Sequence, residues 1–163
     1  MKVAIISDTH DKIDALKKLF EFTKKQGIEI LIHCGDVCRG ETLKEISKNF
    51  KKVYLCWGNG EILESFEESL ENVEIFENVG SLEIEGLKIC FSHFPNIAKK
   101  EFEKGIFDFV FFGHTHFPSL KEENGKYLAN PGSLSFFNPT FAILDTKEKK
   151  LELKFLKEIN NSP

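Results

Sequence analysis

Short apolar segments rich in β-branched residues alternate with helical patterns over the first part of the chain. Each segment of four or five residues predicts a strand, and apolar residues at helical spacing between them predict helices. Consecutive parallel strands joined by helices require right-handed crossovers, so this alternation predicts a largely parallel sheet with helices packed on it. The strands are expected at 3–6, 29–32 and 52–56, and the helices at 13–20, 42–50 and 62–70.

The chain from residue 73 onward is predicted to consist mostly of strands. Tight hairpins are expected around Glu85-Gly86, around Asn124-Gly125 and over residues 146–149. A short helix at 96–104 and a buried strand at 107–112 lie between these hairpins. Since no linker separates the two parts, we expect one domain over residues 1–163. Its fold class is α/β (α+β by some schemes), with two packed sheets flanked by helices.

Composition and charge limit the functions that this chain can have. With 163 residues and 41% hydrophobic content, it can bury one core without help. The net charge of −4 provides no basic stripe for phosphates, so a nucleic acid polymer is an unexpected partner. No apolar run reaches the ~18 residues of a membrane span, and Asp8 interrupts the apolar start before a signal sequence forms. Four cysteines without CxxC spacing predict free thiols and a cytoplasmic location.

Polar residues suited to chemistry follow the predicted strands. In open α/β sheets, ligands bind at the carboxyl ends of the strands, so five segments that are distant in sequence are expected to converge on one site. Asp8 and His10 follow the first strand, Asp36 the second, Asn59 the third, His93 a later strand, and His114 and His116 the strand at 107–112.

This set of oxygen and nitrogen ligands suits Mn, Fe, Zn, Ni or Co. Taken singly, an aspartate beside a turn is more often a cap or turn residue, and Gly58-Asn59 is an ordinary turn. Together, the residues are too many for one ion. One carboxylate shared between two ions would hold them ~3.5–4 Å apart. A binuclear hydrolase site follows as a hypothesis.

Five motifs carry a resemblance to a known family: Asp8-x-His10, Gly35-Asp36, Gly58-Asn59, His93 and Gly113-His114-x-His116. In this order and spacing they resemble the calcineurin-like metallophosphoesterases, and the length is similar to that of the small single-domain archaeal and bacterial phosphodiesterases. The resemblance implies a two-sheet β-sandwich flanked by helices, in four αββα layers.

The resemblance also implies a ligand set and a reaction. Asp8, His10 and His116 would hold one divalent ion, His93, His114 and Asn59 the other, and Asp36 would bridge them. The implied cofactors are two divalent ions, with Mn as the first choice and Ni, Fe, Zn and Co as alternatives. A hydroxide between the ions would attack phosphorus in line.

One departure from the family leaves the catalytic acid unidentified. Many members carry a histidine directly after the Gly-Asn pair, where it can protonate the leaving group, whereas this chain has Gly60 followed by Glu61. Glu61 and His33 are the alternatives for that role, although His33 matches no ligand position and is more simply a structural histidine that orients a ligand. Ser92 also stands where glycine is common.

Contacts to the substrate are less constrained by the sequence. Arg39 reads either as a surface residue or as a phosphate clamp, and Asn59 is a second candidate substrate contact. The segment 130–133 (Asn-Pro-Gly-Ser) reads as a turn and also resembles a motif bordering the site. Trp57 is interpreted as a packing residue. Aromatic residues beside the motif loops could line a pocket or an oligomer interface: Phe94, Phe117, Phe136 and Phe137.

The predicted function is a divalent-metal-dependent phosphoesterase, more specifically a phosphodiesterase acting on a small phosphodiester. The alternative is a non-catalytic protein-interaction scaffold, since the retromer subunit of the same fold is a protein-binding module. Such a scaffold would be expected to lack ligands, whereas all seven positions here carry competent side chains. No membrane partner is expected, and a homo-oligomer is left open.

Overall fold

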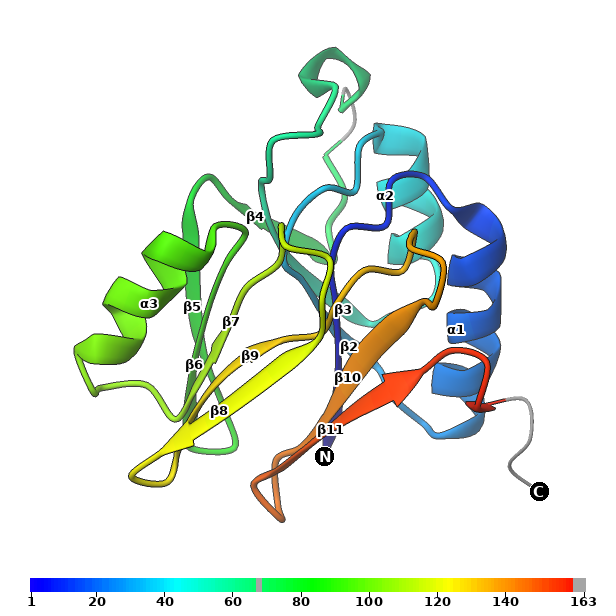
Figure 1. Cartoon of the computed structure of the whole chain (residues 1–163). Coiled ribbons are helices and arrows are strands. Elements are labelled where there is room, and N and C mark those ends of the chain that lie inside the picture. Colours follow the sequence, from blue (N-terminus) through cyan, green and yellow to red (C-terminus); the bar gives the residue numbers. More distant parts are fainter. Residues whose placement is uncertain (67–68, 160–163) are drawn as a thin grey trace.

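Two β-sheets form the centre of the computed structural model, which describes residues 1–66 and 69–159 (Figure 1). The first sheet contains, in spatial order, β11 (Lys150–Phe155), β10 (Thr140–Asp145), β1 (Lys2–Ile6), β2 (Ile30–His33), β3 (Lys52–Cys56) and β4 (Val73–Phe76). The second contains β5 (Val79–Ile84), β6 (Leu87–Ser92), β7 (Phe109–Phe111), β9 (Lys126–Asn130) and β8 (Ser119–Glu123).

The largely parallel sheet predicted for the first part of the chain is confirmed, and the second sheet also has a parallel centre that was not predicted. Strands β1 to β4 pair in parallel, and β10 adds an antiparallel neighbour to β1. In the second sheet, β6, β7 and β9 are parallel. The crossovers carry three helices: α1 (Ile13–Lys25) after β1, α2 (Gly40–Ser47) after β2, and α3 (Pro95–Glu103) after β6.

Alternation along the strands builds four layers. In β1, Val3 and Ile5 face the second sheet and join the cluster between the sheets, whereas Ala4 and Ile6 face α1 and α2. The far side of the second sheet packs on α3 through a smaller cluster around Ala98. In Figure 1, α1 and α2 therefore lie on one side of the paired sheets and α3 on the other. This arrangement confirms the expected fold class.

The helix expected over residues 62–70 was wrong for the residues that the structure describes. Only a three-residue 3₁₀ turn, η1 (Leu63–Ser65), is present, and residues 67–68 lie outside the described part. Ile62 and Leu63 are largely exposed, so the segment has no continuous apolar face. Hydrogen bonds from Ile62 N to Cys38 O and from Gly40 N to Ser65 Oγ hold it against the preceding loop instead.

Several smaller predictions are also settled. The hairpins at Glu85-Gly86 and Asn124-Gly125 have positive φ at both residues, as their turns require. All four cysteines are free, and Cys38 is the one that is not buried. No helix within the described residues is long and apolar enough to cross a membrane.

Candidate metal centre

The loops that follow β1, β2, β3, β6 and β7 meet at one edge of the two sheets. Backbone hydrogen bonds join them directly: Asp8 N donates to Gly35 O at 3.0 Å, and Gly113 N donates to His93 O at 3.0 Å. The seven predicted ligands are carried by these loops and lie together.

One group of ligand atoms comes from Asp8, His10 and His116. Asp8 Oδ1 lies 3.2 Å from His116 Nε2 and 3.9 Å from His10 Nε2. Both Asp8 Oδ1 and His10 Nε2 are buried, and neither has a hydrogen-bond partner within the described residues. Since a buried polar atom without a partner costs about 1–3 kcal/mol, these atoms fit an ion-binding role better than a purely structural one.

A second group comes from Asn59, His93 and His114. Asn59 Oδ1 is 3.1 Å from His93 Nε2 and 3.0 Å from His114 Nδ1, and the two ring nitrogens are 3.2 Å apart. Two atoms bound to one ion at about 2.1 Å are separated by about 3.0–3.4 Å, so this spacing suits a shared ion. His93 Nδ1 donates to Cys34 O at 2.8 Å, which leaves the lone pair of Nε2 facing the group.

Asp36 lies between the two groups and is 2% exposed. Its Oδ2 is 3.5 Å from His10 Nε2, in the first group, and its Oδ1 is 3.6 Å from His93 Nε2, in the second. Each carboxylate oxygen therefore faces a different group.

Five of the candidate ligands have left-handed backbone conformations: Asp8, His10, Asp36, His114 and His116 have φ values of 51°, 41°, 60°, 67° and 64°. Non-glycine residues rarely adopt this region, and strained residues of this kind cluster at functional sites. The strain indicates a site independently of the ligand chemistry.

Cys38 was not singled out by the sequence and lies beside the first group. Its Sγ is 3.4 Å from His10 Nδ1, so it contacts the ring nitrogen opposite the one that faces Asp8 and Asp36. Because Cys38 is a single, partly exposed cysteine outside the motifs, the sequence did not indicate its contact with His10.

His33 lies behind the ligands and is fully buried. Its Nδ1 accepts the Gly35 N–H at 3.1 Å, so the ring proton is on Nε2, which donates to Thr9 Oγ1 at 3.0 Å. Thr9 Oγ1 in turn donates to Asp36 O at 3.3 Å. Burial lowers the pKa of His33 to about 3, against a smaller opposing effect of Asp36. His33 therefore joins the loops after β1 and β2, and both of its ring nitrogens are engaged by Thr9 and Gly35.

We expect His33 to stay neutral, with its proton on Nε2, between about pH 5 and pH 8. Its pKa of about 3 in the fold lies below the ordinary value of 6.5, so the unfolded chain binds the extra proton. Its contribution to stability is therefore complete above pH 6.5. As the pH falls toward 3, the free energy of unfolding decreases by up to about 1.4 kcal/mol per pH unit. Long-range ¹H–¹⁵N NMR of the imidazole rings measures the tautomer, and a His33 ring that titrates near pH 6.5 would contradict the assignment.

Glu61 is also positioned differently from a free catalytic acid. Both of its carboxylate oxygens accept backbone N–H groups, from Asp36, Val37 and Gly58. Burial and then the Asp36 carboxylate raise the pKa of Glu61, while the backbone N–H groups oppose that change. Neither of the two residues considered for the acid role thus presents a free proton to the site.

The segment 130–133 braces the site and does not border it, because Asn130 and Ser133 are fully buried. Asn130 Nδ2 donates to Gly113 O at 3.0 Å and to Thr115 Oγ1 at 2.9 Å, and Ser133 Oγ donates to Asp8 O at 2.9 Å. These bonds hold two ligand loops in place, so the suggested contact with substrate was wrong for these two side chains.

Arg39 is placed on the surface close to the site. Its side chain is 61% exposed, and its Nε lies 3.6 Å from Asp11 Oδ2, an ion pair of low strength at this exposure. Trp57 packs edge-on against Phe66 at 4.8 Å, which confirms its interpretation as a packing residue.

The aromatic residues beside the motif loops form two groups. Phe94 packs on His93 and His114, with ring centroids 5.0 Å and 5.4 Å away. Phe136 lies 6.1 Å from the His116 ring and 5.7 Å from Phe117. Phe117, Phe136 and Phe137 are exposed.

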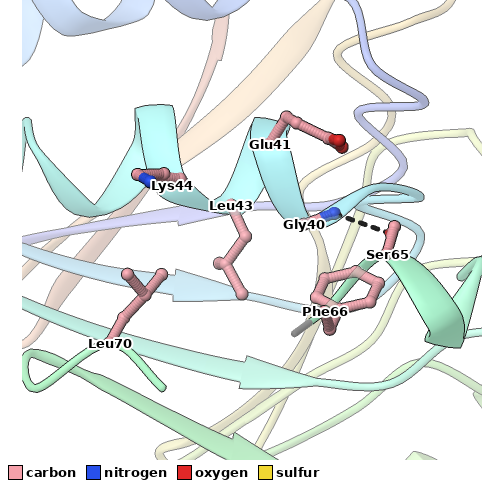
Figure 2. Close-up of a pocket in the computed structure, with 7 residues that line it drawn as sticks. All are labelled: Gly40, Glu41, Leu43, Lys44, Ser65, Phe66 and Leu70. Carbon is pink, nitrogen blue, oxygen red and sulfur yellow. Dashed lines mark hydrogen bonds between the residues drawn. The ribbon is translucent and has the colours of Figure 1, made fainter. Parts of the chain in front are cut away.

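A pocket of about 160 Å³ lies between α2 and the η1 segment, away from the ligands. Figure 2 shows Leu43, Phe66 and Leu70 around its apolar part, with Gly40 N donating to Ser65 Oγ at its end. None of the seven candidate ligands lines it. The candidate site is therefore identified by the convergence of ligand atoms and not by this pocket.

Comparison with known proteins agrees with this geometry. The model of the calcineurin-like phosphoesterase superfamily domain matches residues 1–149, so the chain belongs to this superfamily of metal-dependent phosphoesterases and is a hydrolase. It is similar to Phosphodiesterase MJ0936 of Methanocaldococcus jannaschii, with 30% identity over 159 residues that cover 92% of this chain and 96% of that protein.

Solved structures show the same fold. An archaeal phosphodiesterase superposes with a TM-score of 0.83 and 29% identity, over 95% of this chain and 99% of that one. Vacuolar protein sorting 29 from Cryptosporidium parvum superposes with a TM-score of 0.66 and 20% identity, over 94% and 95% of the two chains. The second similarity extends to the fold alone.

Proposed function

We propose that this chain hydrolyses phosphodiesters at a binuclear metal site, with a hydroxide between the two ions as the nucleophile. The observation that carries the proposal is the arrangement of two groups of three ligand atoms with one carboxylate oxygen of Asp36 facing each. Two divalent ions bound there would lower the pKa of a bound water and neutralise charge on the phosphoryl oxygens.

We assign the ligands by these contacts. Asp8, His10 and His116 would hold one ion, Asn59, His93 and His114 the other, and Asp36 would be shared. Mixed oxygen and imidazole donors suit Mn, Ni, Fe, Zn and Co, and Mn is proposed as the first choice because of the resemblance to the family. His93 is kept in the correct tautomer by Cys34 O, and the His114 loop is held by the bond from its own N–H to Asp8 Oδ2 at 3.0 Å.

Diester substrates are proposed because a similar archaeal protein and a solved archaeal structure are each described as a phosphodiesterase. The net charge of −4 favours a small phosphodiester over a nucleic acid polymer. We also propose a cytoplasmic location, because all four thiols are free. Self-association through the exposed Phe117, Phe136 and Phe137 is a further proposal.

The alternative is a protein-interaction scaffold with this fold, as the similarity to vacuolar protein sorting 29 suggests. Metal binding does not separate the two functions, because one such protein, from Entamoeba histolytica, was solved in complex with Zn²⁺. Turnover does separate them.

The experiment is a hydrolysis assay of the metal-depleted protein before and after addition of each candidate ion. Bis(4-nitrophenyl) phosphate and 4-nitrophenyl phosphate serve as a matched diester and monoester with one leaving group. The proposal expects metal-dependent turnover with preference for the diester. Absence of turnover with Mn, Ni, Zn, Fe and Co would leave the scaffold function.

Arg39 is proposed as a contact to a non-bridging phosphate oxygen, reached by release of its exposed pair with Asp11. Substitution Arg39→Lys keeps the charge but loses the two-pronged guanidinium geometry. We expect kcat/KM for a diester to decrease by about 1–2 kcal/mol in equivalent free energy. An unchanged kcat/KM would show that Arg39 is a surface residue without contact to the substrate.

We expect a steep dependence of rate on the pKa of the leaving group. A positioned acid contributes about 10²- to 10⁴-fold, and both residues considered for that role, Glu61 and His33, are engaged elsewhere. Aryl diesters with acidic leaving groups should therefore be cleaved far faster than alkyl diesters.

The measurement is a series of substituted phenyl diesters under conditions where chemistry limits the rate. A slope near zero would mean that another acid is present. The variant Gly60→His would restore the histidine that many family members carry as the acid. It is a poor test, because a Cβ at Gly60 would lie 3.2 Å from the Asp36 carboxyl carbon and crowd it. Gly60 is not among the glycines with positive φ, so crowding and not backbone strain is the obstacle.

A further inference from the structure

The Glu61 carboxylate joins the loop after β3 to the loop after β2. Its Oε1 accepts the N–H of Asp36 at 2.7 Å and that of Val37 at 3.3 Å, while its Oε2 accepts the N–H of Gly58 at 2.9 Å. One side chain therefore satisfies backbone donors on both loops. Hydrogen bonds to a charged carboxylate are shorter and stronger than neutral ones, so this contact restricts the relative movement of the two loops.

The Asp36 carboxylate makes the reverse connection. Its Oδ1 accepts the N–H groups of Asn59 and Gly60 at 2.8 Å and 2.7 Å. The backbone of the second loop also lies close against it, because a Cβ on Gly58 would be 2.2 Å from Asp36 Oδ1. Asp36 and Glu61 thus each accept backbone N–H groups from the loop that carries the other.

This exchange explains how two neighbouring carboxylates are held in the correct geometry. Five backbone N–H groups point at the two carboxylates and offset their mutual repulsion. The Oδ1 atom of Asp36 is fixed by two of them, which turns Oδ2 toward His10 Nε2, 3.5 Å away. The orientation that places one oxygen toward each ligand group is therefore set by the loops themselves.

We propose that Glu61 is a positioning residue for the reaction: by clamping the loops after β2 and β3 together, it fixes the orientation in which Asp36 faces both ligand groups. The role of Asp36 as shared ligand rests on the proposed function, whereas the clamp itself is a property of the protein chain. Glu61 does not touch the ligand atoms directly. Its effect reaches the site through Asp36 and Asn59.

The variant Glu61→Gln tests the clamp with little change in shape. One amide NH₂ group then replaces a carboxylate oxygen, so a donor meets a backbone N–H on one of the two loops. Glu64→Gln is the matched control, because Glu64 lies three residues further along and is exposed. Glu61→Asp keeps the charge but shortens the reach, and it serves as the second variant if Glu61→Gln does not fold.

Three readouts are compared at a temperature well below unfolding. Isothermal titration measures Mn²⁺ affinity, and we expect it to fall about 10- to 100-fold in Glu61→Gln, the range typical of groups that orient ligands. Electron paramagnetic resonance of the Mn²⁺-loaded protein should lose the signal of a coupled ion pair. In diester hydrolysis, kcat should fall by a similar factor with little change in KM, and Glu64→Gln should match the unmodified protein throughout.

Amide hydrogen exchange of the metal-free protein is a fourth measurement, which does not depend on metal binding. Asn59 and Gly60 donate to Asp36 and not to Glu61, so faster exchange at these two amides in Glu61→Gln shows that the contact between Asp36 and the loop after β3 depends on Glu61. A lower unfolding temperature with unchanged Mn²⁺ affinity, kcat and exchange at Asn59 and Gly60 would overturn the proposal and leave a structural role alone.

Failure of the proposed function would be recognised in the unmodified protein. It would then hydrolyse no diester or bind fewer than two ions, and the exchange measurement would still decide whether Glu61 holds Asp36.

Discussion

Substitution Asp36→Asn is expected to lower kcat/KM for a phosphodiester at least about 100-fold. Asparagine keeps the Oδ1 acceptor for the N–H groups of Asn59 and Gly60, so the loops retain their contacts. It removes the negative charge that faces both ligand groups. Two ions stabilise the transition state by several kcal/mol. A loss of about 3 kcal/mol of this stabilisation corresponds to a decrease in rate of about 100-fold.

The matched control is Asp14→Asn. Asp14 is exposed in the first turn of α1 and belongs to neither ligand group, so the same change is made outside the candidate site. Metal content per chain, unfolding temperature and kcat/KM are measured for both variants. Full activity in Asp36→Asn would show that the proposed sharing of this carboxylate is wrong.

Removal of metal is expected to abolish turnover and to lower the unfolding temperature by about 5–11 °C for each ion that is lost. An ion at 100 times its dissociation constant stabilises the fold by about 2.7 kcal/mol, and about 1 kcal/mol shifts the unfolding temperature by about 2–4 °C for a chain of this size. The loss of stability should be confined to the ligand loops. Asp8 Oδ1 and His10 Nε2, which have no hydrogen-bond partner within the described residues, lie in these loops and not in the hydrophobic core.

Scanning calorimetry with and without chelator checks this expectation, and re-addition of Mn²⁺ is the control for irreversible damage. Amide exchange locates the change, which should centre on the loops after β1, β2 and β3. An unfolding temperature that does not respond to chelator or to any candidate ion would contradict metal binding at this site.

The sequence predicted the fold well where apolar spacing decides the outcome. In β1, four consecutive apolar residues serve both faces of a sheet that is covered on each side, which is why the run is continuous and does not alternate. The ligand loops could be predicted for a related reason: parallel strands end at a common edge, so residues such as Asp8 and Asp36 are brought together by topology.

Other features depend on contacts that a sequence does not display. Residues 62–70 have helical spacing, yet the bonds of Ile62 to Cys38 and of Ser65 to Gly40 decide the course of residues 62–65. Edge strand β4 was missed because half of its residues are exposed, so its pattern is weak. Asn130 was interpreted as a turn residue and Glu61 as a candidate acid, since only the fold shows which backbone groups their side chains bind.

The left-handed backbone at five candidate ligands sets activity and fold stability against each other. Glycine fits these angles without the ~1–2 kcal/mol of strain that another residue carries there. At His116, whose ion pair within the described residues is with Asp8, a glycine would relax the backbone while removing a ligand. In the metal-free protein, mutations that improve thermal resistance are therefore expected to be enriched at the candidate ligand positions, and a screen for stability in the absence of metal would select variants that have lost the site.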